Sequence, residues 1–212
     1  MKSFVSDKII AAEIAKGLLE IEAIKLRPEN PFTWASGWKS PIYCDNRMSL
    51  SFPKLREQIT KALTVEIKAT YSNVEAIAGV ATAGIPQGAL VAAELGVPFI
   101  YVRSKAKGHG MTNLIEGKIV KGQKVVVIED LVSTGGSSLK AVEDLRSNDI
   151  EVLGMAAIFT YDFPIAKENF ENANCDLTCL SDYNELLKIA GLAEEQLETL
   201  KKWREDPSLW NA

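Results

Sequence analysis

Features that would place this chain in several common protein classes are scarce. It has three cysteines in 212 residues, too few for a disulfide-rich scaffold. Cys175 and Cys179 also lack two further ligands at zinc spacing, so we expect Cys44, Cys175 and Cys179 to be structural thiols in a reducing compartment. The formal net charge of −4 argues against a general nucleic-acid binder, and we expect no nucleic-acid partner.

Long apolar segments and targeting signals are also missing. The longest apolar run, Val152 to Phe159, is far too short to span a bilayer. The N-terminal residues include Lys2, Asp7 and Lys8 and contain no apolar signal core. We therefore expect a cytoplasmic protein with no membrane partner.

Hydrophobic residues make up 47% of the chain, which favours a packed core over disorder. Apolar residues recur at helical spacing in some segments and run continuously in others, as in buried parallel strands. The predicted helices are 6–26 (with Ser6 as N-cap), 53–70, one beginning near Pro86, 139–146 and 182–204. The predicted strands are 74–80, 98–102, 123–130, 150–159 and 176–180, with short extended pieces that can pair as a hairpin within 30–47. This alternation predicts an α/β fold with a doubly wound, mostly parallel five-stranded sheet.

The segment 129–138, named here the acid–turn segment, follows the most apolar predicted strand. Glu129 and Asp130 are adjacent carboxylates at the mouth of that strand, and such a pair is costly to bury unless it binds something. A turn rich in Ser, Thr and Gly follows, before a predicted helix. Its backbone N–H groups and hydroxyls, with the helix N-terminus, suit a phosphate. The segment therefore suits a sugar phosphate, with the acids on sugar hydroxyls.

A plainer interpretation is that the Ser and Thr side chains cap the helix and the acids are solvated. The acid pair and the double glycine together favour a binding site. Neither of the two common nucleotide loops, G-x-x-x-x-G-K-[ST] and G-x-G-x-x-G, occurs between a strand and a helix.

A basic strip occupies residues 103–110. Arg103, Lys105, Lys107 and His109 recur at every second residue, so an extended backbone would project all four from one face. No acid lies between Glu94 and Glu116. The strip is either a solvated loop with incidental lysines or a flap that closes on an anion. The chain's single histidine lies in it between two glycines, which favours the flap.

Two further segments leave alternatives open. The turn at 81–86, flanked by Gly79 and Gly84, either points N–H groups at a diphosphate or is an ordinary strand–helix connection. The turn-rich segment 31–47, named here the hood segment, carries Trp34 and Trp38. These rings either form a hydrophobic flap over the core or stack on a planar ligand.

The acid–turn segment resembles the signature with which type I phosphoribosyltransferases bind 5-phosphoribosyl 1-diphosphate (PRPP). The hood segment is similar to that of the orotate phosphoribosyltransferases, through Phe32, Thr33, Ser36, Gly37, Lys39, Ser40 and Pro41. The strip at 103–118 resembles the long loop with which members of that family reach the neighbouring subunit's active site. The resemblance implies the type I phosphoribosyltransferase fold and a small N-terminal hood. It implies one domain over 1–212: hood about 1–50, core about 51–181 and C-terminal helices 182–212.

The resemblance also implies an activity: transfer of the phosphoribosyl group from PRPP to orotate, in UMP synthesis. Mg²⁺ would be held mainly through PRPP, with no metal site made by the protein alone, and the enzyme would be a homodimer. The resemblance assigns catalysis to Arg103, Lys107 and His109, and orotate binding to Ser133 and backbone groups. The residues expected to bind PRPP are Arg103, Lys107, His109, Glu129, Asp130, Leu131, Val132, Ser133, Thr134, Gly135, Gly136 and Ser137.

The chain departs from the family pattern at four places. Ala35 and Ala83 stand where lysines are frequent, Ser104 replaces a lysine after Arg103, and no arginine follows Phe159. Three alternatives stay open: a phosphoribosyltransferase for another base, a non-enzymatic PRPP-sensing regulator that binds nucleic acid, and an α/β fold with no phosphate site. The hood motif argues against the first. The charge-balanced N-terminal helix, with no basic face, argues against the second.

Overall fold

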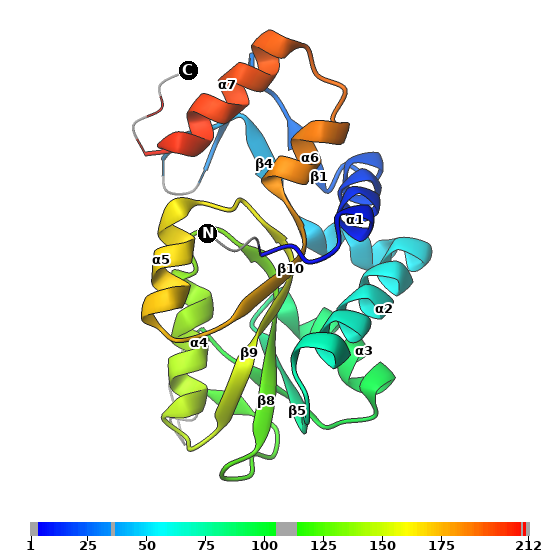
Figure 1. Cartoon of the computed structure of the whole chain (residues 1–212), viewed down its shortest axis with the longest axis vertical. Helices are drawn as coiled ribbons and strands as arrows, with labels where there is room; N and C mark the ends of the chain where they lie inside the picture. Colours follow the sequence, from blue (N-terminus) through cyan, green and yellow to red (C-terminus); the bar gives the residue numbers. More distant parts are fainter. Residues whose placement is uncertain (1–3, 35–36, 105–113, 209, 211–212) are drawn as a thin grey trace.

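A computed structural model describes residues 4–34, 37–104, 114–208 and 210 of the chain (Figure 1). In chain order its elements are α1 (Lys8–Glu20), β1 (Ile24–Leu26), β2 (Phe32–Thr33), β3 (Lys39–Ser40), β4 (Ile42–Cys44), the 3₁₀ helix η1 (Asn46–Ser51), α2 (Pro53–Thr70), β5 (Ala76–Val80), α3 (Gly84–Leu95), β6 (Phe99–Val102), β7 (Ile115–Glu116), β8 (Lys124–Val132), α4 (Gly136–Arg146), β9 (Glu151–Thr160), α5 (Pro164–Asn172), β10 (Leu177–Asp182), α6 (Tyr183–Ile189) and α7 (Glu194–Glu205). No helix in these described ranges combines the length and apolarity needed to cross a membrane.

The central sheet has the strand order β10-β9-β8-β5-β6-β7. The five predicted strands are present and pair in parallel, which confirms the predicted fold class. A sixth strand, β7, pairs antiparallel with β6 and was not predicted. With only two residues, β7 is too short to give a periodic signal in the sequence.

Helices cover both faces of this sheet. In Figure 1, α2 and α3 lie on one side of the strands and α4 and α5 on the other. The side chains of β8 alternate accordingly, because successive residues of a strand point to opposite faces. Val126 and Ile128 lie in the core under α2 and α3, whereas Val125 and Val127 lie in the core under α4 and α5. A strand buried on both faces reads as the continuous apolar run seen in the sequence.

The strands β1 and β4 and the helix α7 lie together beyond one end of the sheet (Figure 1). β1 pairs antiparallel with β4, and β2 with β3, so the predicted hairpin within 30–47 is confirmed. Trp203 of α7 has 0% of its surface exposed, and its ring centroid lies 5.7 Å from that of Trp34. Trp210 packs against the same core, so the predicted return of the C-terminal tail is confirmed. The contact of Trp203 with Trp34 joins α7 to the hood segment.

Several predicted boundaries were wrong. The helix predicted over 6–26 ends at Glu20, and its N-cap is Asp7, which accepts from the N–H groups of Ile9 and Ile10. Ser6 instead donates to Glu66 Oε2 at 2.6 Å. The stretch 182–204 is two helices, because residues 190–193 interrupt it.

Three further boundary errors fall at the site. β8 continues to Val132 rather than ending at Asp130, since β9 offers backbone partners as far as Thr160. α4 begins at Gly136, three residues earlier than predicted, and α3 begins at Gly84 rather than near Pro86. Each turn is therefore shorter than expected, and the helix N-termini lie closer to the strand ends.

Candidate functional site

The acid pair lies near the C-terminal end of β8. Glu129 is 6% exposed, and it pairs across the ladder with Ala157 of β9. Its Oε2 accepts a hydrogen bond of 2.9 Å from Ser138 Oγ at the start of α4, and its Oε1 accepts from the N–H of Asp130 at 3.1 Å. Two elements that follow one another in the chain therefore hold the first carboxylate.

Both acids are poorly solvated. Burial, and then the neighbouring charge of Asp130, raise the pKa of Glu129 to about 8. Burial also raises the pKa of Asp130, against a smaller opposing effect of the Arg47 guanidinium. The charged pair is thus destabilised in the free protein, and a ligand that donates hydrogen bonds to it would offset this cost.

The end of the hood segment contacts the acid pair through Asn46. Asn46, 1% exposed at the start of η1, donates from Nδ2 to the backbone carbonyl of Asp130 at 2.6 Å. Its Oδ1 accepts from Cys44 Sγ at 3.3 Å, and Ser49 Oγ donates to its backbone carbonyl at 2.6 Å. The backbone between the acids and the turn is thereby fixed by a residue of the N-terminal part.

The turn after the acids has the geometry of an anion cradle. Gly135 has φ +84°, and a Cβ there would lie 2.7 Å from the ring of Phe170, so only glycine fits without strain. Asn169 Nδ2 donates to the carbonyl of Thr134 at 2.9 Å and holds the turn against α5. No side chain in the described part of the chain caps α4. The capping interpretation of the Ser and Thr residues is therefore wrong, and no side chain in the described ranges occupies the N–H groups at the start of α4.

The ends of β5 and β6 approach this turn. Arg103 and Ser104 line a small hollow of about 80 Å³ together with Ala81 and Ser137, so the structure brings Arg103 beside the start of α4. Arg103 Nη1 lies 3.5 Å from Glu116 Oε1 of β7. Gly84 packs so tightly that a Cβ would lie 2.4 Å from the carbonyl oxygen of Ile128, which brings α3 directly against β8. Lys107 and His109 lie outside the described residues, as do Lys105, Ala35 and Ser36.

A second, more apolar hollow of about 410 Å³ lies between the hood segment and the ends of β8 and β9. Its lining residues are Thr33, Trp34, Tyr43, Cys44, Leu131, Ser133 and Tyr161. The ring of Trp34 also packs 5.6 Å from that of Tyr161 and 5.7 Å from that of Trp203, measured between centroids. Trp34 therefore belongs to the core and to the hollow at once, whereas Trp38 is 38% exposed. The hollow fits a planar ring beside Ser133.

Three residues of the site were missed at the sequence level. The sequence analysis assigns Ser138 to the turn and not to the site. In the structure Ser138 is a buried residue of α4 that donates a hydrogen bond to Glu129. Asn46 and Tyr161 carry no local signal, because each reaches the site only through long-range packing. The polar run Asp45–Asn46–Arg47 at the end of the hood segment is the only hint of Asn46 in the sequence.

Comparisons with known proteins agree with this geometry. The family model described as the phosphoribosyl transferase domain matches residues 53–195. An orotate phosphoribosyltransferase of Cytophaga hutchinsonii is 59% identical over 93% of this chain and 97% of its own. The crystal structure of the orotate phosphoribosyltransferase from Aeropyrum pernix superposes with a TM-score of 0.75 at 31% identity, covering 84% of this chain and 98% of that one. The Mycobacterium tuberculosis orotate phosphoribosyltransferase, solved in complex with PRPP, gives a TM-score of 0.65 at 26% identity, with 84% and 98% covered.

Proposed function

Since the chain belongs to the orotate phosphoribosyltransferases, we propose that it transfers the 5-phosphoribosyl group from PRPP to orotate, in UMP synthesis. The products are orotidine 5′-phosphate and diphosphate. The observation that carries this proposal is the acid pair, Glu129 and Asp130, followed by a short turn into a helix N-terminus with no side-chain cap, beside an apolar hollow. One continuous segment thereby offers acceptors for a sugar, donors for a phosphate and a wall for a base.

The roles of the residues follow from their chemistry. Glu129 and Asp130 accept hydrogen bonds from the ribose hydroxyls, while the backbone and hydroxyls of residues 131–137 hold the 5′-phosphate. Orotate lies in the hollow of about 410 Å³ beside Ser133. Arg103, with Lys107 and His109, surrounds the diphosphate. Residues 1–50 act as the hood over one catalytic core, with the C-terminal helices supporting it.

In the reaction, the bond from ribose carbon 1 to the diphosphate oxygen breaks, and a ring nitrogen of orotate bonds to the same carbon. The leaving diphosphate takes the bonding electrons, so negative charge builds on it as carbon 1 gains oxocarbenium character. Preorganised cations lower this barrier most, which assigns the main catalytic task to Arg103, Lys107 and His109. None of these residues needs to act as a covalent nucleophile.

Mg²⁺ is the metal that this chemistry implies, and it would neutralise charge on the diphosphate. The carboxylate oxygens of Glu129 and Asp130 are hard donors that fit it. Because Mg²⁺ usually binds through one or two carboxylates plus substrate phosphates, we propose that it is held mainly through PRPP itself.

We propose that the enzyme is a homodimer in which the 103–118 loop acts on the partner's site. Mixing two variants, Lys107→Ala and Asp130→Asn, tests this. Both variants are assayed at a PRPP concentration well below the weakened KM of Asp130→Asn, where each alone is strongly impaired. If the loop acts across subunits, one site of each mixed dimer combines an intact loop with an intact acid pair, and the rate of the mixture rises well above that of either variant. If the loop acts within its own subunit, every site keeps one defect and the mixture is no faster than the two variants measured apart.

The activity itself is tested by following the loss of orotate absorbance after PRPP and Mg²⁺ are added, with His109→Ala alongside. Loss of absorbance that depends on PRPP supports the proposal. A panel of other bases distinguishes a purine or uracil enzyme. If no base reacts, while DNA or RNA binds with strong salt dependence, the protein is the regulator and the proposal is wrong.

A further inference from the structure

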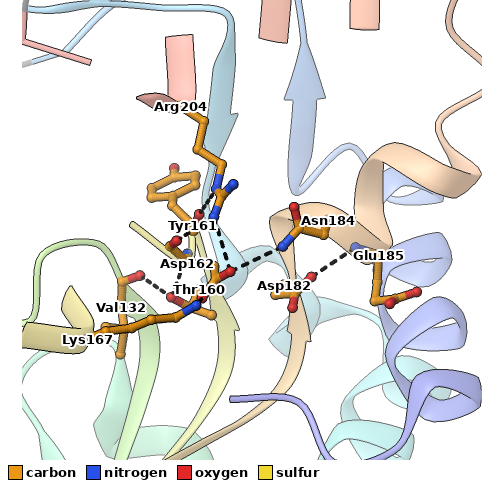
Figure 2. A network of polar contacts seen from close by, with 9 residues as sticks. All are labelled: Val132, Thr160, Tyr161, Asp162, Lys167, Asp182, Asn184, Glu185 and Arg204. Carbon is orange, nitrogen blue, oxygen red and sulfur yellow. Dashed lines mark hydrogen bonds and ion pairs between the residues drawn. The ribbon is translucent and has the colours of Figure 1, made fainter. Parts of the chain in front are cut away.

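Asp162, two residues beyond the end of β9, is the centre of a polar network that joins three helices (Figure 2). Its side-chain Oδ2 accepts from Asn184 Nδ2 of α6 at 3.1 Å and from Arg204 Nη2 of α7 at 3.2 Å. Lys167 Nζ of α5 lies 2.9 Å from its other carboxylate oxygen. Asp162 is 6% exposed, so its charge is stable only while these cations and donors stay in place.

Arg204 also holds the backbone of the same loop. Its Nε donates to the carbonyl of Tyr161 at 3.2 Å, and its Nη2 donates to the carbonyl of Asp162 at 2.8 Å. One guanidinium therefore fixes two successive carbonyl groups and a carboxylate. Asp162 has φ +54°, a conformation that needs support from its surroundings in a residue with a side chain.

The opposite end of the network reaches the acid–turn segment. Thr160 Oγ1 donates to the carbonyl of Val132 at 3.0 Å and accepts from the N–H of Asp162 at 3.0 Å. The N–H of Tyr161 donates to the same carbonyl of Val132 at 3.2 Å. Val132 directly precedes Ser133, so a continuous chain of hydrogen bonds connects α7 with the turn proposed to hold phosphate and base (Figure 2).

This network fixes the position of Tyr161. Its ring lines the hollow beside Leu131 and Ser133, and it packs against Trp34 and Trp203. We infer that Arg204 and Asp162 are positioning residues for the base: they fix the Tyr161 peptide, and with it one wall of the hollow, relative to the acid–turn segment. This inference rests on the proposed assignment of that hollow to orotate.

The geometry requires an arginine at position 204. A lysine keeps the charge but is a single point donor on a flexible stem, so it cannot hold two carbonyls and a carboxylate together. Arg204→Lys should therefore loosen the Tyr161 peptide while the protein stays folded. We expect KM for orotate to rise about tenfold, which corresponds to roughly 1.4 kcal/mol, and KM for PRPP to change by less than about twofold.

The test compares Arg204→Lys, Asp162→Asn and the double variant, with Lys201→Ala as control. Lys201 is an exposed cation of the same helix that pairs with Glu194 and Glu198. Because Arg204 and Asp162 act as one unit, the effects on KM for orotate should be strongly non-additive in the double variant. Lys201→Ala should match the wild type in both KM values. If Arg204→Lys does not fold, Asp162→Asn is expected to give the same rise in KM for orotate with little change in KM for PRPP.

Three outcomes overturn the inference: unchanged KM for orotate in folded variants, equal rises in both KM values, or additive effects in the double variant. Ser133→Ala distinguishes a wrong positioning role for Arg204 and Asp162 from a wrong assignment of the hollow to orotate. If Ser133→Ala raises KM for orotate but Arg204→Lys does not, only the positioning role is wrong. If neither raises it, orotate binds elsewhere and both are wrong.

Discussion

Asn46 donates a hydrogen bond of 2.6 Å to the backbone carbonyl of Asp130, across 84 positions of sequence. This bond joins the N-terminal part of the chain directly to the backbone of the acid pair. Because Asn46 is buried, its loss leaves that carbonyl without this donor.

Asn46→Ala should therefore weaken PRPP binding and lower the free energy of unfolding by about 1–3 kcal/mol. We expect KM for PRPP to rise about tenfold, because the backbone of the acid pair is no longer held. Steady-state kinetics and urea unfolding measure the two effects. Asn148→Ala is the matched control, since Asn148 Nδ2 makes a similar 2.8 Å bond to the carbonyl of Asp144 on the surface. Equal behaviour of the two variants would contradict the assigned role.

Gly135→Ala should destabilise the protein by about 2 kcal/mol, since φ of +84° is unfavourable for a residue with a Cβ. The added Cβ would also press on the ring of Phe170. Gly136→Ala is the control for stability, because the nearest neighbour of its added Cβ would be Thr134 Oγ1 at 4.0 Å. Urea unfolding of both variants measures the difference, and equal stabilities would rule out a conformational need for glycine at 135.

The raised pKa of Glu129 predicts a pH dependence of stability in the ligand-free protein. A carboxyl whose folded pKa is about 8, against an ordinary 4.5, holds its proton in the folded state when the unfolded state has lost it. Between these two pKa values the folded state binds more protons than the unfolded state. The contribution of Glu129 to the free energy of unfolding is therefore fully present below its ordinary pKa and is lost as pH rises through its folded pKa.

Glu129→Gln removes this titration, so its stability should fall less than that of the wild type between about pH 4.5 and about pH 8. Urea unfolding at several pH values gives the two slopes. Binding should show the opposite trend, because PRPP needs the charged acceptor: wild-type affinity for PRPP should weaken as pH is lowered below the raised pKa. Parallel stability slopes for the two proteins would show that Glu129 titrates normally.

Asp130→Asn should weaken PRPP binding about ten- to hundredfold, which is the range for losing a charge-assisted hydrogen bond of roughly 1.5–3 kcal/mol. The fold should persist, because Asn46 binds the backbone carbonyl of Asp130 and not its side chain. Calorimetric titration with PRPP gives the affinity, and the thermal midpoint checks the fold. An unchanged affinity would remove the acid from the sugar site.

Lys107→Ala should lower kcat about a hundredfold or more while changing PRPP affinity far less, if the loop stabilises charge that develops only in the transition state. Lys121→Ala is the matched control, since Lys121 is an exposed lysine paired with Asp149. Kinetics at saturating orotate distinguish the two parameters. A loss confined to KM would show that the loop binds substrate and transition state equally.

The acid pair and its turn were predictable because their chemistry is contiguous: an apolar strand, two acids and a glycine-containing turn occupy neighbouring positions. The five parallel strands were predictable for the same reason, since burial on both faces leaves a continuous apolar run. Boundaries were less well predicted. β8 extends past the acids because β9 pairs with it there. The paired residues, Val132 of β8 and Thr160 of β9, are 28 positions apart in the sequence.

The amino-acid sequence by itself determined the order of the main strands and helices, the family and the position of the acid–turn segment, because these depend on local periodicity and adjacent side chains. Only the tertiary structure decided that Asn46, Tyr161 and Arg204 meet this segment. Such contacts depend on how the helices and the two chain ends pack over the sheet, and no local pattern records which distant side chain will complete a hydrogen bond.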